Sequence, residues 1–150
     1  MKRLVLAGVL AWGAAVCAQE APGYRFDRPE LLADQHVWGI AHGARLLALA
    51  CARAGHGAAA EAWTIWQERE WAQIDVIRAA LSQHYFQRDD APPDAIAAAL
   101  GLKPALALPA DELGPACATL AEALAQPRYD LPKRREELLA KYREEAVKNK

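Results

Sequence analysis

The chain has 150 residues, of which 18 are Lys or Arg and 19 are Asp or Glu, so its formal net charge is −1. This length suits one domain, and the charged and apolar fractions of 25% and 53% argue against a disordered chain and a multi-span membrane protein. A net charge so close to zero also argues against a general nucleic-acid binder, which is normally strongly basic.

The first 18 residues have the order of a secretory signal peptide. Lys2 and Arg3 precede an uncharged apolar run, Leu4 to Val16, which is shorter than the about 20 residues that span a bilayer. We therefore expect cleavage after Ala18, and a periplasmic or secreted protein with no membrane span in its mature form. Loss of the two cations leaves a mature net charge of −3. The alternative is a lipoprotein that is lipidated at Cys17.

The composition of the chain predicts an all-α protein. Ala occurs 35 times, whereas Val, Ile and Thr together occur 13 times. Helices favour Ala and strands favour β-branched residues. We predict a small helical bundle, built on a long αα-hairpin, in residues 19–131, followed by a charged C-terminal helix or tail in residues 132–150.

Two long helices come first in the predicted bundle. Asp27 is expected to cap the first helix, with Glu30 as its reciprocal partner, and the helix is expected to end near Ala54. Residues 58–87 contain no Gly or Pro and are expected to form the second helix. Because the turn at Gly55–Gly57 is short, the two helices should fold back on each other as a hairpin.

Shorter helices are predicted beyond the hairpin. One runs from Pro92 to Leu100 and is closed by Gly101, a residue suited to the left-handed conformation at a helix end. An extended connection, residues 102–109, leads to another helix from Ala110 to Ala125. The charge-dense residues 132–150 carry only a thin apolar stripe and are expected to lie on the surface.

Two cysteines, Cys51 and Cys117, remain after the expected cleavage. Cysteines of an exported chain usually pair, because the periplasm and the cell exterior are oxidising. We therefore predict a disulfide that pins the helix around Cys117 across the first helix of the hairpin. Two separately buried thiols are the alternative.

Tryptophans are concentrated in the predicted hairpin, and this residue type is enriched at the energetic centres of protein interfaces. Trp63 and Trp66 are expected to fill the core. Trp71 lies off the apolar stripe of the second helix and is, with Trp38, the candidate for contact with a partner. The alternative for Trp71 is packing beneath the connection 102–109.

Glu70 lies on the apolar stripe of the second helix, where a carboxylate must be paired, hydrogen-bonded or protonated. Its candidate partners are Arg45, Arg53 and His42. One interpretation is a buried ion pair that fixes the register of the helices. Another is a functional carboxylate in a cleft, which anchors a ligand or acts as an acid/base group and makes Glu70 a candidate binding residue. A modest shift of the helix axis would instead leave Glu70 solvated.

A metal site is the alternative reading of the hairpin. His42 and His84, with Glu70, would give nitrogen and oxygen ligands that suit zinc or copper if the two helices bring them together. His36 and His42 are six residues apart and point to different sides of one helix, so they are not expected to chelate one ion. The chain contains no familiar catalytic or zinc-binding motif.

These observations predict an exported periplasmic helical protein that acts by binding another periplasmic or secreted protein. An accessory subunit, an assembly factor and an immunity-type factor all fit this description. No catalysis, cofactor or nucleic-acid partner is expected. The alternative is a metal-binding or small-ligand-binding protein that uses His42, Glu70 and His84 in a cleft of the bundle.

Overall fold

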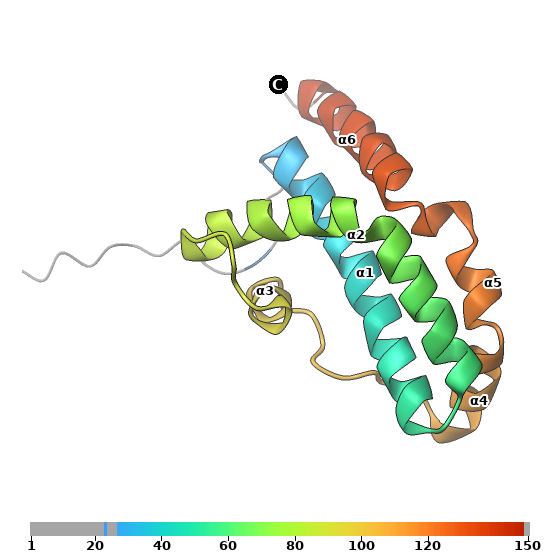
Figure 1. Ribbon diagram of the computed structural model, residues 1–150. Helices are drawn as coiled ribbons and strands as arrows, with labels where there is room; N and C mark the ends of the chain where they lie inside the picture. Colours follow the sequence, from blue (N-terminus) through green and yellow to red (C-terminus); the bar gives the residue numbers. More distant parts are fainter. Residues whose placement is uncertain (1–22, 24–26, 149–150) are drawn as a thin grey trace, which may run out of the picture.

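The computed structural model describes residue 23 and residues 27–148, so the predicted signal peptide, its cleavage site and Cys17 lie outside the described residues. Over the described part, the chain forms α-helices and one short 3-10 helix and contains no strand (Figure 1). The predicted all-α bundle is therefore confirmed. None of the described helices is long and apolar enough to cross a membrane.

The predicted αα-hairpin is formed by α1 (Pro29–Arg53) and α2 (Gly57–Phe86), which pack against each other. Gly55 adopts a positive φ of 84° immediately after α1, and the His56 N–H donates to the Cys51 carbonyl over 2.9 Å. This backbone bond closes the helix end and reverses the chain. The largest fully buried side chains include Trp66, Ile77, Leu81, Ile96, Leu120 and Leu131.

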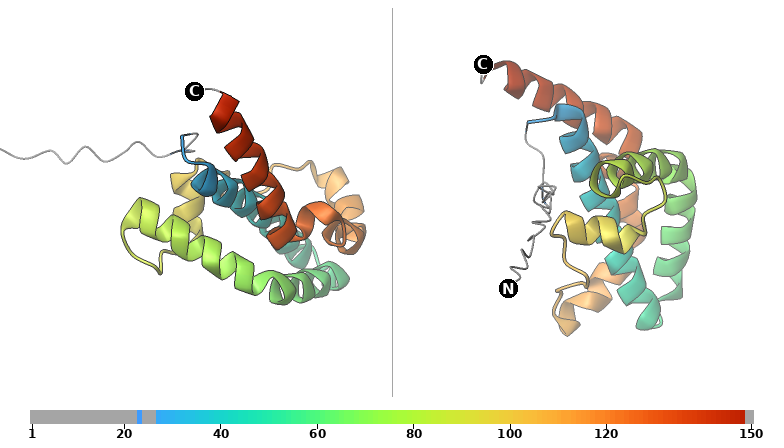
Figure 2. Two further views of the ribbon diagram at one scale, coloured as in Figure 1. Left: turned by 90° about the horizontal axis from the view of Figure 1, so that it is seen from above. Right: turned by 90° about the vertical axis from the view of Figure 1, so that its left-hand side faces the viewer.

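A bend in α2 shapes one face of the molecule. Figure 1 shows the first half of α2 running beside α1 and the second half turning across it, and the right-hand view of Figure 2 shows the same bend from another side. The short helix α3 (Pro93–Ala99) packs against α2 on the inner side of the bend. Part of α1 is therefore enclosed between the bent α2 and the start of α3.

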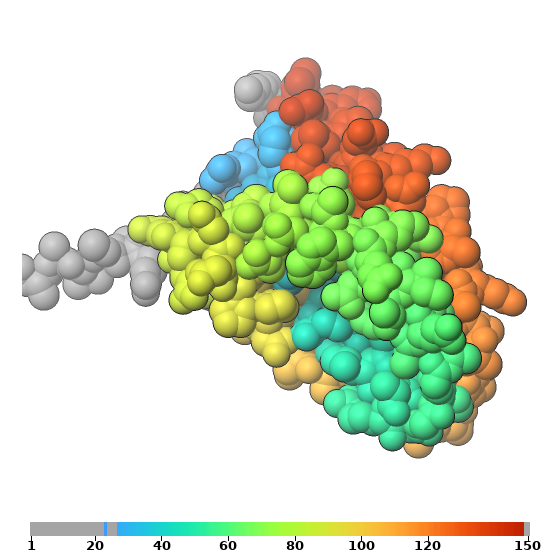
Figure 3. Space-filling model, in the orientation of Figure 1, coloured from blue at the N-terminus to red at the C-terminus, as the bar shows by residue number. Residues whose placement is uncertain are grey.

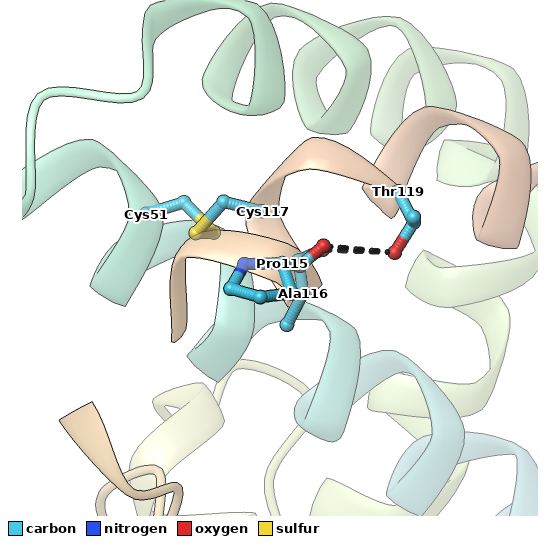
Figure 4. The surroundings of a disulfide bond; sticks show 5 residues. All are labelled: Cys51, Pro115, Ala116, Cys117 and Thr119. Carbon is cyan, nitrogen blue, oxygen red and sulfur yellow. Dashed lines mark hydrogen bonds between the residues drawn. A yellow bond between two sulfur atoms is a disulfide. The ribbon is translucent and has the colours of Figure 1, made fainter. Parts of the chain in front are cut away.

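The helix predicted for residues 110–125 is divided into α4 (Ala110–Ala118) and α5 (Leu120–Leu124). The interruption falls at Thr119, whose hydroxyl donates to the Pro115 carbonyl over 3.2 Å (Figure 4). A threonine hydroxyl that bonds the backbone of the preceding turn competes with regular helix geometry. The break therefore comes one turn after the proline rather than at it.

The predicted disulfide is present between Cys51 and Cys117, whose Cα atoms are 5.6 Å apart (Figure 4). Both residues are buried, with 0% and 4% of their surface exposed. The bond joins the last turn of α1 to α4, two elements that also pack against each other. It holds α4 across the hairpin near its turn.

The charged C-terminal segment forms α6 (Leu131–Lys148), which follows the 3-10 helix Pro127–Tyr129 and packs against α1 (Figure 2). Leu131, Leu138 and Tyr142 are its buried side chains. Arg135 donates to the buried carboxylate of Asp34 on α1 over 2.6 Å. An apolar stripe and an ion pair thus dock α6 on the bundle.

The capping arrangement predicted for the first helix is wrong. The N-cap residue is Arg28, which makes no side-chain capping bond, and Pro29 occupies the first helical position. Proline suits this position, since it lacks the N–H that would otherwise need a partner. Glu30, the expected partner of Asp27, instead accepts a hydrogen bond from Arg143 of α6 over 2.8 Å.

The contact between α1 and α6 includes a histidine with a lowered pKa. His36 Nδ1 lies 2.8 Å from the Tyr142 hydroxyl. Burial, followed by the charges of Lys141 and Arg134, lowers the pKa of His36 below its ordinary value of 6.5. The unfolded chain therefore binds a proton on this residue at a higher pH than the folded protein does.

We expect the free energy of unfolding to fall as the pH is lowered from 7 towards 5, and to fall less in a His36→Gln variant. Below about pH 6.5 the unfolded state binds more protons at this residue, so acid favours unfolding. Urea unfolding of both proteins at several pH values measures the difference. The measurements stop at pH 5 so that Glu30 does not contribute to the difference. The hydrogen bond from Arg143 lowers the pKa of Glu30, so the stability that Glu30 adds is lost only at lower pH. Equal losses in the two proteins would contradict the prediction.

Candidate binding site

A small hollow lies on the inner side of the bend of α2, and we call it the tryptophan hollow. Its volume is about 100 Å³. Figure 3 shows this face, with the surface of α1 recessed between α2 and the segment around α3. The lining residues come from α1, α2 and the first residue of α3: Trp38, Ala41, His42, Arg45, Trp63, Gln67, Trp71, Ile74, Arg78 and Pro93.

The structure brings together two of the predicted contact residues, Trp38 and Trp71, in the wall of this hollow. Trp71 has 52% of its surface exposed, whereas Trp38 has 6%. Trp71 is therefore half exposed and not buried beneath the connection 102–109, and its role as a contact with a partner stays a prediction. Trp63, expected in the core, is partly buried and forms a third aromatic wall.

The formally charged residues in the lining are both arginines, Arg45 and Arg78. Arg45 is paired with Asp94 of α3. Arg78 donates to Asp75 over 2.8 Å and to the Asp89 carbonyl over 3.1 Å. A guanidinium carries five N–H donors, so each arginine keeps donors beyond these bonds. The lining is therefore aromatic and apolar with two cationic groups and no carboxylate.

His42, the one imidazole in the lining, is hydrogen-bonded to the chain itself. Its Nε2 lies 2.8 Å from the Lys103 carbonyl oxygen. A carbonyl only accepts, so Nε2 carries the proton and donates it. This bond fastens the connection after α3 to α1, and it occupies one of the two ring nitrogens that would bind a metal.

Trp38 carries an unusual buried donor. Its Nε1 is buried and has no hydrogen-bond partner among the residues that the structure describes. Buried N–H groups are nearly always paired, and leaving one unpaired costs about 1–3 kcal/mol. Because this nitrogen is inaccessible to solvent, a molecule bound in the hollow could reach it only if the Trp38 ring moved.

Glu70 lies outside the tryptophan hollow, in a groove formed with the segment 125–133. It is 4% exposed. Its Oε1 accepts from Arg69 Nε over 2.6 Å and its Oε2 accepts from the Leu131 N–H over 3.0 Å. The partners are therefore the neighbouring arginine and a backbone amide, and not Arg45, Arg53 or His42 as the sequence suggested.

The bond from Leu131 to Glu70 gives an acceptor to one of the N–H groups that have no partner within the helix at the N-terminus of α6. Leu131 is its first residue, Pro132 has no N–H, and the next two amides, of Lys133 and Arg134, donate to Asp130 over 3.2 and 2.8 Å. The Leu131 amide would be left without a partner if Glu70 were absent. A carboxylate is also stabilised by the positive end of the helix dipole at this position. Glu70 thus fixes α6 to the hairpin.

Trp66, one turn before Glu70 on α2, also helps to attach the start of α6 to the hairpin. Its Nε1–H donates to the Tyr129 carbonyl over 2.9 Å, and its ring meets that of Tyr129 edge to face. Trp66 is 1% exposed, as expected for a core residue. The two side chains together hold the backbone of residues 129–131 against α2.

The three residues of the predicted metal site line three different hollows. His84 lies with Glu30 and Asp34 near the start of α1, apart from the hollow of His42 and the groove of Glu70. Over residues 27–148, no group of three or more His, Cys, Asp or Glu side chains is placed to hold a metal ion. The fold therefore gives these residues no shared cleft.

Gln67 and Arg78, which line the hollow beside Trp71, were not among the predicted site residues, and Trp63 and Ile74 were expected on the core stripe of the second helix. With Trp71 these residues follow one another in steps of four and three, so they share one helix face. The spacing alone does not separate a row that lines a hollow from a row that packs in the core.

Comparison of the chain with family models, with curated proteins and with solved structures gives no match. The assignment of function therefore depends on the residues and on their arrangement.

Proposed function

We propose that this is an exported helical protein that acts by binding another periplasmic or secreted protein at the tryptophan hollow. The observation that carries the proposal is Trp71, a half-exposed tryptophan at an apolar hollow between two helices. Aromatic residues and arginine are enriched where protein interfaces are strongest, and both types line this site. An accessory, assembly or immunity-type factor acts through such a surface without catalysis.

Export is supported by two independent features. The order of charged, apolar and small residues in positions 1–18 is that of a cleaved signal peptide. The disulfide between Cys51 and Cys117 is typical of proteins that fold in an oxidising compartment. The denaturing mass of the protein recovered from the periplasm or the medium is expected to correspond to residues 19–150, with the mass of an intact disulfide.

Cross-linking from the hollow tests the binding function. We expect a Trp71→p-benzoylphenylalanine variant, illuminated in the cells that naturally produce the protein, to form one main covalent product with another protein. The matched control places the same residue at Ile65, which is also exposed on α2 but lies outside the hollow. Mass spectrometry of the products identifies the partner.

Two results would contradict the proposal. The first is the absence of any protein product from position 71. The second is the same set of products from positions 71 and 65, because contact would then reflect exposure and not the hollow.

A further inference from the structure

The size of the tryptophan hollow limits what it holds. Its volume of about 100 Å³ is well below the 300–1,000 Å³ of ordinary small-molecule pockets. One compact apolar group, such as a single side chain, fits this space.

The walls of the hollow favour an apolar group with an acid beside it. Three indole rings and Ile74 supply apolar contact, while Arg45 and Arg78 supply positive charge. The carboxylates that pair with these arginines, Asp94 and Asp75, are 81% and 48% exposed. Exposed ion pairs are weak, so another carboxylate can share or replace either partner. A cationic group in the same place would meet two arginines and no carboxylate in the lining.

We infer that the tryptophan hollow binds a segment of the partner protein in which one apolar side chain is adjacent to a carboxylate. The apolar side chain enters between Trp38, Trp63 and Trp71, and the carboxylate accepts from Arg45 or Arg78. This inference rests on the proposed function and adds the chemistry of the segment that is recognised.

Three small probes with the same apolar body test the inference: phenylpropionate, phenylpropanamide and phenylpropylammonium. Binding is followed in the purified protein by the NMR signals of the tryptophan indole N–H groups, assigned with single Trp→Phe variants. Signals of Trp38, Trp63 and Trp71 are expected to move. The signal of Trp66 is the internal control, because its N–H is bonded to Tyr129 and it does not line the hollow.

The anionic probe is expected to bind about tenfold more tightly than the cationic one, the gain typical of one additional hydrogen bond to a charged group. Arg45→Gln and Arg78→Gln should each reduce this preference and leave the affinity for the neutral amide unchanged. Arg53→Gln is the matched control, since Arg53 is an exposed arginine of α1 outside the lining. Trp71→Ala should weaken the binding of all three probes.

The inference is overturned if no probe moves the three signals, if the three probes bind equally, or if Trp66 responds as strongly as Trp71. These results leave a cross-linked partner at position 71 unaffected, so the proposed function would stand. Conversely, preference for the anion without any protein product at position 71 would mean that the hollow binds a free small acid. That result contradicts both the proposed function and the peptide segment.

Discussion

Removal of the Cys51–Cys117 disulfide is expected to lower the free energy of unfolding by about 4 kcal/mol. The bond joins residues that are 66 positions apart in the sequence. In the chain-entropy model, a cross-link that closes a loop of this length lowers the entropy of the unfolded chain and so destabilises the unfolded state by about 4 kcal/mol. Native domains are stable by only about 5–15 kcal/mol, so the reduced protein should be close to unfolding. Urea unfolding with and without reductant measures the loss.

A double variant, Cys51→Ala with Cys117→Ala, distinguishes the effect of losing the disulfide from any other effect of the reductant on stability. It should be slightly less stable than the reduced protein and should not respond to reductant. Both cysteines are buried, so the two truncations add a small packing loss of their own. A reduced protein within about 1 kcal/mol of the oxidised one would show that the fold does not depend on this bond.

Replacement of Glu70 by Ala is expected to cost about 2–3 kcal/mol of unfolding free energy. The change leaves the Leu131 N–H buried and without its acceptor, and such orphaned groups cost about 1–3 kcal/mol each. Loss of the carboxylate at the start of α6 adds about a few tenths of a kcal/mol, because its favourable interaction with the positive end of the helix dipole is lost. Urea unfolding again measures the effect.

Glu68→Ala is the matched control for Glu70, because Glu68 is an exposed glutamate two residues earlier on the same helix. Its cost is expected to stay within about 0.5 kcal/mol. If Glu70 served a ligand and not the fold, both variants would be equally stable. Protection of the α6 amides against hydrogen exchange should also fall in Glu70→Ala and not in Glu68→Ala.

The helical class and the hairpin were predictable because they depend on local signals. The scarcity of β-branched residues predicts helices, and Gly55 marks the turn at which α1 ends. Gly101 has the predicted left-handed conformation after α3, with a φ of 68°. The cysteine pair was predicted from the leader-like start of the chain, and the structure confirms the bond.

Partners that meet only through tertiary structure were not predictable. Glu70 was expected to face α1, but its Oε2 accepts from a backbone amide 61 residues later in the chain, and its Oε1 accepts from Arg69. The division of the helix at Thr119 depends on a side-chain bond that composition does not reveal. The bend of α2 was not predictable from the sequence, because residues 58–86 contain no Gly or Pro. This bend encloses the tryptophan hollow.

The position of the disulfide also determines how the protein responds to a protease. The segment between Cys51 and Cys117 includes all of α2 and α3 and the exposed residues 103–105. A single cut there leaves two fragments that stay covalently joined until the sulfur bond is reduced. A cut in the exposed stretch 125–128 lies beyond Cys117, so α6 is then held by contacts alone. Cleavage before or after Cys117 therefore has different consequences: one yields a nicked but linked molecule, and the other allows its last helix to dissociate.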